Sequence, residues 1–157
     1  MSNTFSTLLL AATLLGTLVP DASAEPGVSG NFLGDGKPAK LAFVSAKKGE
    51  PFSDKDTVVV VLTEKDQSKS KNPKFDAGFG KLGSALILTI NTEGRIIGCE
   101  VAHSAHTKSP FSAVGRIKTA DFKWADGVVQ AKVSTGGDDE AFGQKWNVDL
   151  KFEAKVQ

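Results

Sequence analysis

The stretch WNVDLKFEAK, residues 146–155, decides the fold. Its apolar side chains occupy every second position and are Trp146, Val148, Leu150, Phe152 and Ala154. The residues between them are polar or charged. A period of two is that of an extended strand with one buried and one wet face. Such a strand must cover its apolar face with other strands, so the sequence predicts an all-β fold.

Seven further segments are predicted as strands and are separated by glycine-rich or acidic turns. They are Val28–Leu33, Lys40–Ala46, Thr57–Thr63, Ala85–Asn91, Arg95–His103, Ile117–Trp124 and Val128–Val133. Asp126-Gly127 is a dipeptide favoured in two-residue hairpins, and Thr57–Thr63 reads TVVVVLT, which is typical of a strand buried on both faces. We therefore predict an antiparallel β-sandwich or barrel of about eight strands.

One segment departs from the strand pattern. Asn72 and Pro73 are typical of a helix start, and Phe75, Phe79 and Leu82 recur at helical spacing. We predict one short helical segment of one or two turns, held over a sheet edge.

The first 24 residues have the pattern of a signal peptide. Residues 8–19 read LLLAATLLGTLV, and Ala22-Ser23-Ala24 is the small–x–small pattern of a cleavage site. We expect a signal peptide over residues 1–24 and a single all-β domain over residues 25–157, in the periplasm or secreted. No later stretch is apolar enough to span a membrane, so the mature chain should hold no integral membrane segment.

Charge and cysteine content narrow the function classes. The chain has 19 Lys and Arg against 18 Asp and Glu, and loss of Asp21 with the signal raises the net charge from +1 to +2. So small a charge argues against nucleic acid as a partner. The single cysteine cannot form an internal disulfide, so stability must come from packing.

The stretch GCEVAHSAH, residues 98–106, holds that cysteine and both histidines. On a regular strand Cys99 shares a face with Ile97 and Val101, which predicts a buried, reduced thiol. Cys99 and His103 lie about 13 Å apart along an extended strand, too far for one metal ion. A small metal-binding protein that uses His103 and His106 stays open as an alternative.

The loop of residues 104–114 is the predicted functional surface. It follows the strand that ends in His103, and we expect ligand-binding side chains at His103, His106, Ser109 and Ser112, with Phe111 folded back as an apolar anchor. A hydrolase with its site in this loop is the other alternative. Because no nucleophile motif occurs, we prefer an exported, non-enzymatic binding or interaction domain without catalytic residues or cofactor. Its partner would be an unknown protein or glycan.

Two further features bear on partners. The lysines at positions 65, 69, 71, 74 and 81 make the region before and within the predicted helix basic, so it could contact anionic glycan or lipid headgroups, or serve only solubility. Trp124 and Trp146 are predicted in the core, whereas an exposed pair would indicate a sugar-stacking surface.

Three segments of the sequence resemble parts of a known group of proteins. Residues 28–66 (VSGNFLGDGKPAKLAFVSAKKGEPFSDKDTVVVVLTEKD), residues 121–137 (DFKWADGVVQAKVSTGG) and residues 146–156 (WNVDLKFEAKV) share an order of strands and turns. In this order the chain resembles small exported bacterial all-β domains of no established activity. The resemblance implies export and an all-β fold, and it brings no functional residues with it.

Processing can be tested directly. We expect the exported protein to begin at Glu25, because Ala22 and Ala24 supply the small residues that signal peptidase requires. Intact-mass measurement or N-terminal sequencing of exported material checks this. Soluble exported protein that retains Met1 would contradict it.

Overall fold

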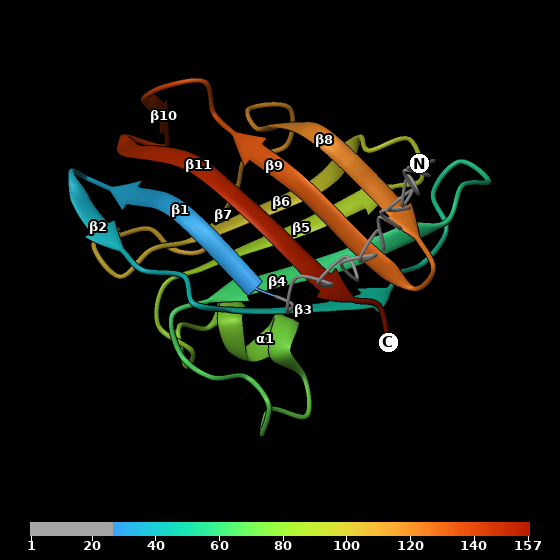
Figure 1. Cartoon of the computed structure of the whole chain (residues 1–157). Helices are drawn as coiled ribbons and strands as arrows, with labels where there is room; N and C mark the ends of the chain where they lie inside the picture. Colours follow the sequence, from blue (N-terminus) through green and yellow to red (C-terminus); the bar gives the residue numbers. More distant parts are fainter. Residues whose placement is uncertain (1–26) are drawn as a thin grey trace, which may run out of the picture.

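The computed structural model describes residues 27–157, which form eleven strands and one short helix arranged as two antiparallel sheets (Figure 1). The first sheet has the order β2-β1-β11-β9-β8. The short strand β10 pairs with the first three residues of β11, which β9 does not reach. Its strands are β1 (Gly27–Gly34), β2 (Lys37–Ala39), β8 (Lys118–Ala125), β9 (Val128–Ser134), β10 (Asp139–Ala141) and β11 (Gln144–Lys155). The second sheet has the order β3-β4-β5-β6-β7. Its strands are β3 (Phe43–Lys48), β4 (Thr57–Thr63), β5 (Ala85–Asn91), β6 (Ile96–Ala102) and β7 (Phe111–Ser112).

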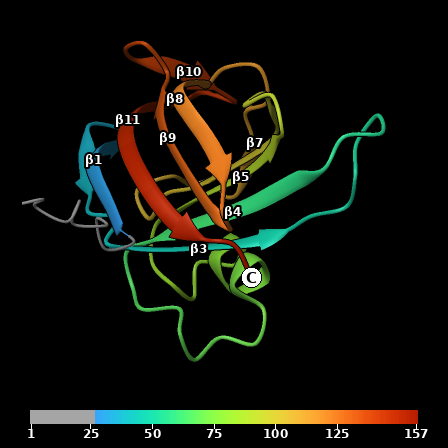
Figure 2. The ribbon, with the colours of Figure 1, turned by 45° about the vertical axis from the view of Figure 1, so that its right-hand side comes forward.

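A single core lies between the two sheets. Every second residue of β11 enters it, from Trp146 to Ala154, and the second sheet contributes Val58, Val60 and Leu62 from β4. Figure 2 shows the two sheets as separate layers, with β11 and β9 in front of β4 and β5. The fold is therefore sandwich-like, and the prediction of an all-β fold is confirmed. The alternative of a closed barrel is wrong.

Eleven strands form instead of about eight, because three short ones escape the alternation pattern. β2, β7 and β10 contain three, two and three residues, too few to show a period of two. The predicted strand Lys40–Ala46 differs from the observed one, because the short strand β2 was not predicted before it. The chain first makes β2 on the first sheet and then crosses, so that the strand on the second sheet is β3 (Phe43–Lys48). Leu41 is buried in the core, whereas Phe43 is 39% exposed.

β6 contains a register shift, so the core neighbours of Cys99 differ from those predicted. Leu88 pairs with Cys99 and Ile90 with Ile96, so one extra residue of β6 lies between these pairs. Ile96, rather than Ile97, therefore enters the core with Cys99 and Val101. The thiol is buried as predicted, with 2% exposure, and its burial, with a smaller contribution from the charge of Glu100, raises its pKa to about 12.

The helix α1 (Pro73–Gly78) forms where the sequence predicts it, with Asn72 as its N-cap. It packs against β4, β5 and β6 and thus covers the outer face of the second sheet, not an edge. A small second core forms beneath it, made by Val61, Ala77, Leu82, Ala85, Ile87 and Ala102. Both faces of β4 are covered in consequence, as its TVVVVLT sequence predicts.

The predicted signal peptide, residues 1–24, lies outside the described residues 27–157. Among the described residues no helix has the length and apolar character to cross a bilayer.

The buried thiol yields a chemical test. A thiol reagent should modify Cys99 slowly in the folded protein and rapidly after denaturation, because burial and a raised pKa both suppress the reactive thiolate. Cys99→Ala should lower the free energy of unfolding by about 1 kcal/mol through the cavity that it leaves. Rapid labelling in native buffer would contradict this placement.

Candidate functional site

The two histidines that the sequence singles out lie together in the interior. His103 is 2% and His106 8% exposed, and their ring centroids are 5.2 Å apart. Phe32 and His103 form a T-shaped contact with ring centroids 4.9 Å apart, and the ring centroids of Phe111 and His106 are 5.4 Å apart. Gly34 of β1 packs directly on the His103 ring, since a Cβ atom there would collide with it. The pair thus helps close one end of the space between the sheets.

Hydrogen bonds fix the proton positions of both rings. The backbone N–H of Ala105 donates to Nδ1 of His103 at 3.1 Å, so the proton of this neutral imidazole sits on Nε2. Nε2 of His106 lies 2.9 Å from the carbonyl oxygen of Lys145 and must donate to it, which leaves Nδ1 as the acceptor. The remaining donor and acceptor, His103 Nε2 and His106 Nδ1, are buried and have no partner among the described residues.

The hydrogen bonds of the two histidines can be compared with what a metal site or a hydrolase, the two alternatives derived from the sequence, would need. A metal ion at His103 Nε2 would require that nitrogen to lose its proton, and the Ala105 N–H would then face a protonated Nδ1. Within residues 27–157 no group of three or more His, Cys, Asp or Glu side chains is placed to hold a metal. In the same range neither imidazole forms a hydrogen bond with a hydroxyl or a carboxylate, which a histidine general base of a hydrolase would need.

The structure separates the two predicted serines from the histidines. Ser112 pairs with Glu100 across β6 and β7 and is exposed, and Ser109 is exposed in the loop. The loop itself is tied to the first sheet, because the buried Gln144 accepts hydrogen bonds from the Lys108 N–H and the Thr107 hydroxyl. Phe111 is buried as predicted and contacts Trp146. Ligand binding by His103, His106, Ser109 and Ser112 stays a prediction, and it would require this closed end to open.

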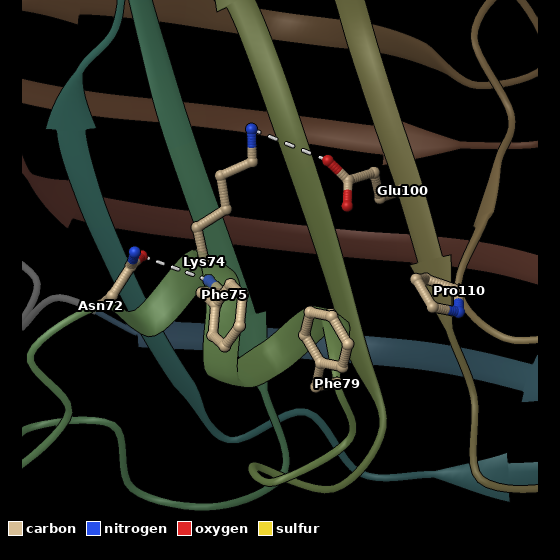
Figure 3. Close-up of a pocket in the computed structure, with 7 residues that line it drawn as sticks. Asn72, Lys74, Phe75, Phe79, Glu100 and Pro110 are labelled. Carbon is tan, nitrogen blue, oxygen red and sulfur yellow. Dashed lines mark hydrogen bonds and ion pairs between the residues drawn. The ribbon is translucent and has the colours of Figure 1, made fainter.

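A different surface presents apolar side chains to solvent. Phe75 and Phe79 of the α1 region are 52% and 70% exposed, and their ring centroids are 4.5 Å apart. With Pro110 they border a hollow of about 260 Å³ on the outer face of the second sheet. Figure 3 shows the two rings side by side, with Phe79 between Phe75 and Pro110. We call Phe75 and Phe79 the aromatic pair.

The helical spacing of Phe75, Phe79 and Leu82 left open which way their side chains point, and the structure buries Leu82 but leaves the aromatic pair in solvent. The side of α1 that meets the sheet carries Ala77 and Gly78, whose small size lets the helix approach closely. Helical spacing shows that Phe75 and Phe79 share a face, but not which way that face points.

Charged groups surround the aromatic pair. Lys74 lies 3.7 Å from Glu100, as Figure 3 shows, and Lys81 forms an ion pair with Asp76 at 2.9 Å. The Lys81 ammonium is also 5.6 Å from the Phe75 ring centroid, within cation–π range.

The loop before α1 is anchored, so its lysines are displayed from a defined backbone. The buried Gln67 donates to the Val61 carbonyl oxygen and accepts from the Ser45 hydroxyl. Asp66 accepts hydrogen bonds from the N–H and hydroxyl of Ser68, which lower the pKa of its carboxyl group. Three exposed lysines have no ion-pair partner among residues 27–157; they are Lys65, Lys69 and Lys71.

The buried histidine makes stability depend on pH. Burial foremost, and then the neighbouring His106, lowers the pKa of His103 below its ordinary 6.5, while the charges of Glu64 and Asp35 and the nearby Lys37 backbone act in the opposite direction. Below pH 6.5 the unfolded chain therefore binds a proton that the folded chain resists. We expect the free energy of unfolding to fall between pH 7.5 and pH 5.5 in urea titrations.

The matched variant is His103→Asn, whose side-chain oxygen can replace Nδ1 as the acceptor for the Ala105 N–H. It should be less stable at pH 7.5, because it leaves a cavity, but its stability should change less with pH. An equal pH dependence in both proteins would show that His103 is not the responsible group.

Comparison with known proteins gives no relative for this chain: no protein-family model, curated protein or solved structure matches it.

Proposed function

We propose that this protein is an exported, non-enzymatic binding domain, and that its contact surface is the aromatic pair together with the lysines of the adjoining loop. The ligand that fits this surface best is the headgroup layer of an anionic phospholipid bilayer. The observation that carries the proposal is the exposure of Phe75 and Phe79 beside three cations that have no ion-pair partner among residues 27–157.

The exposure of the aromatic pair has no structural explanation within the described chain. The small core beneath α1 is complete without either ring, since Ala77, Leu82 and Ile87 fill it. Paired exposed aromatic side chains leave apolar area in water, and such patches mark surfaces that contact something else. An aromatic ring gains free energy when it enters the region between lipid headgroups and acyl chains.

The charge of the region has the sign that an anionic surface attracts. Residues 64–81 contain five lysines and three acidic residues. The acidic side chains are engaged locally: Glu64 accepts from the Ser84 N–H, Asp66 from Ser68, and Asp76 from Ser70 and Lys81. Five lysines against three carboxylates leave the segment with a net charge of +2, and lysines near an anionic membrane each contribute to binding.

Shape favours a deformable surface over a folded partner. α1 and the loop before it project from the second sheet, a feature visible in Figure 1 and Figure 2. The neighbouring hollow, at about 260 Å³, lies below the size of ordinary ligand pockets. A stable protein complex needs about 800 Å² from each partner, whereas a protruding tip can insert into headgroups without a matching groove.

Vesicle co-sedimentation tests the proposal with the soluble protein recovered after expression of the full chain. We expect it to sediment with vesicles of phosphatidylcholine mixed with phosphatidylglycerol, and much less with phosphatidylcholine alone. Phe75→Ser combined with Phe79→Ser should reduce the bound fraction at least fivefold. Lys69→Glu combined with Lys71→Glu should abolish the preference for anionic vesicles, and added salt should weaken wild-type binding.

Matched controls use the same residue types elsewhere on the surface. Phe52→Ser with Phe142→Ser removes two other exposed aromatic rings, and Lys47→Glu with Lys151→Glu reverses two other exposed lysines. Both control proteins should bind anionic vesicles like the wild type. Failure of the wild type to bind, or equal losses in controls and test variants, would refute the proposal.

A further inference from the structure

A second cavity lies at the end of the molecule where the β8–β9 hairpin meets the C-terminal residues. It has a volume of about 460 Å³, within the usual range of small-ligand sites. Its walls come from five separate segments of the chain: the end of β3, the residues before β4, the β5–β6 turn, the β8–β9 hairpin and residues 156–157. Figure 1 shows this region around the label C, at the opposite side from β2.

Backbone hydrogen bonds hold these walls in place. The Thr92 N–H donates to the Asp56 carbonyl oxygen at 3.2 Å, which joins the β5–β6 turn to the start of β4. The Val156 N–H donates to the Gly127 carbonyl oxygen at 2.8 Å, and the Lys48 N–H to that of Gln157 at 3.3 Å. A cleft whose walls are already fixed loses little entropy when it binds a ligand.

The side chains in the cleft have a distinctive composition. Trp124 is half-buried and lines the cleft, whereas the other tryptophan, Trp146, is only 1% exposed in the core. Asp56 and Asp126 are exposed beside it, and neither carboxylate has a hydrogen-bond or ion-pair partner among residues 27–157. Lys48 and Thr92 complete the polar lining.

We infer that this cleft binds a neutral oligosaccharide. The C–H groups of a sugar ring carry a slight positive charge and pack on an indole, whose π face is negative. The ring hydroxyls donate hydrogen bonds to carboxylates, which are acceptors only, and accept them from an ammonium or hydroxyl group. Trp124, Asp56 with Asp126, and Lys48 with Thr92 supply each of these functions around one cavity.

Charge narrows the class of saccharide. Two side-chain carboxylates face one ammonium group, so the lining repels uronate, sulfate and phosphate groups. A neutral sugar meets no such repulsion, and its hydroxyls fit unpaired carboxylates. This site is independent of the aromatic pair, which lies on the outer face of the second sheet.

Tryptophan fluorescence offers a direct readout, because the chain has only two tryptophans and one of them is buried. Maltohexaose, cellohexaose and chitohexaose are titrated as neutral probes, with oligogalacturonate as the anionic probe. We expect at least one neutral probe to shift the emission to shorter wavelength, and oligogalacturonate to leave it unchanged. Calorimetry with the responding probe should show at least tenfold weaker binding for Trp124→Leu, and a similar loss for Asp56→Ala combined with Asp126→Ala.

Controls separate a loss of the site from a loss of the fold. Asp149→Ala and Phe142→Ala change exposed residues outside the cleft and should bind like the wild type. Trp124→Phe keeps an aromatic face and should bind more tightly than Trp124→Leu. The inference is overturned if no neutral probe changes the emission at millimolar concentration, if oligogalacturonate binds as tightly, or if the control variants lose as much affinity.

Discussion

The pairing of β1 with β11 is the constraint on which the rest of the structure depends. These strands come from the two ends of the described chain and pair over eight residues, from Gly27 with Glu153 to Gly34 with Trp146. β11 also pairs with β9 and β10, so it joins every hairpin of the first sheet. Because these contacts link distant parts of the chain, the sheet can form only when both ends are present. The alternation in β11 then fixes which face of that sheet meets the core.

The parts of the fold that the sequence predicts are those in which one period persists over a whole strand. β4 and β5 have the predicted bounds, and β11 shows six buried residues in strict alternation with six exposed or half-buried ones over its whole length. Asp126 and Gly127 both have positive φ, 52° and 73°, as the predicted two-residue hairpin requires. Patterns fail where a register shift interrupts the period, as at Ile96 in β6, and where a strand is too short to show one.

The candidate sites were less predictable, for two separate reasons. The sequence indicated that His103 and His106 lie close together, but their burial depends on Phe32 and Gly34, which come from the other sheet. For α1, helical spacing indicated a shared face for Phe75 and Phe79, whereas the direction of that face depends on Ala77 and Gly78, which pack on the sheet. The cleft at Trp124 gathers five segments that no spacing rule connects.

The two ends of the sandwich differ in whether their unpaired polar groups reach solvent, and the proposed saccharide site rests on this difference. At the histidine end, Gln144 and the Lys145 carbonyl oxygen bind the loop of residues 104–110, and aromatic rings fill the space between the sheets. The unpaired nitrogens of His103 and His106 are buried there, away from solvent. At the other end the backbone groups are paired, but Asp56, Asp126 and Lys48 are left without side-chain partners among the described residues. Polar side chains that are paired within the fold hold it together, and those that a rigid backbone leaves free are available to a ligand. The residue types alone favoured the histidine end, whereas the exposure of the unpaired polar side chains favours the tryptophan end.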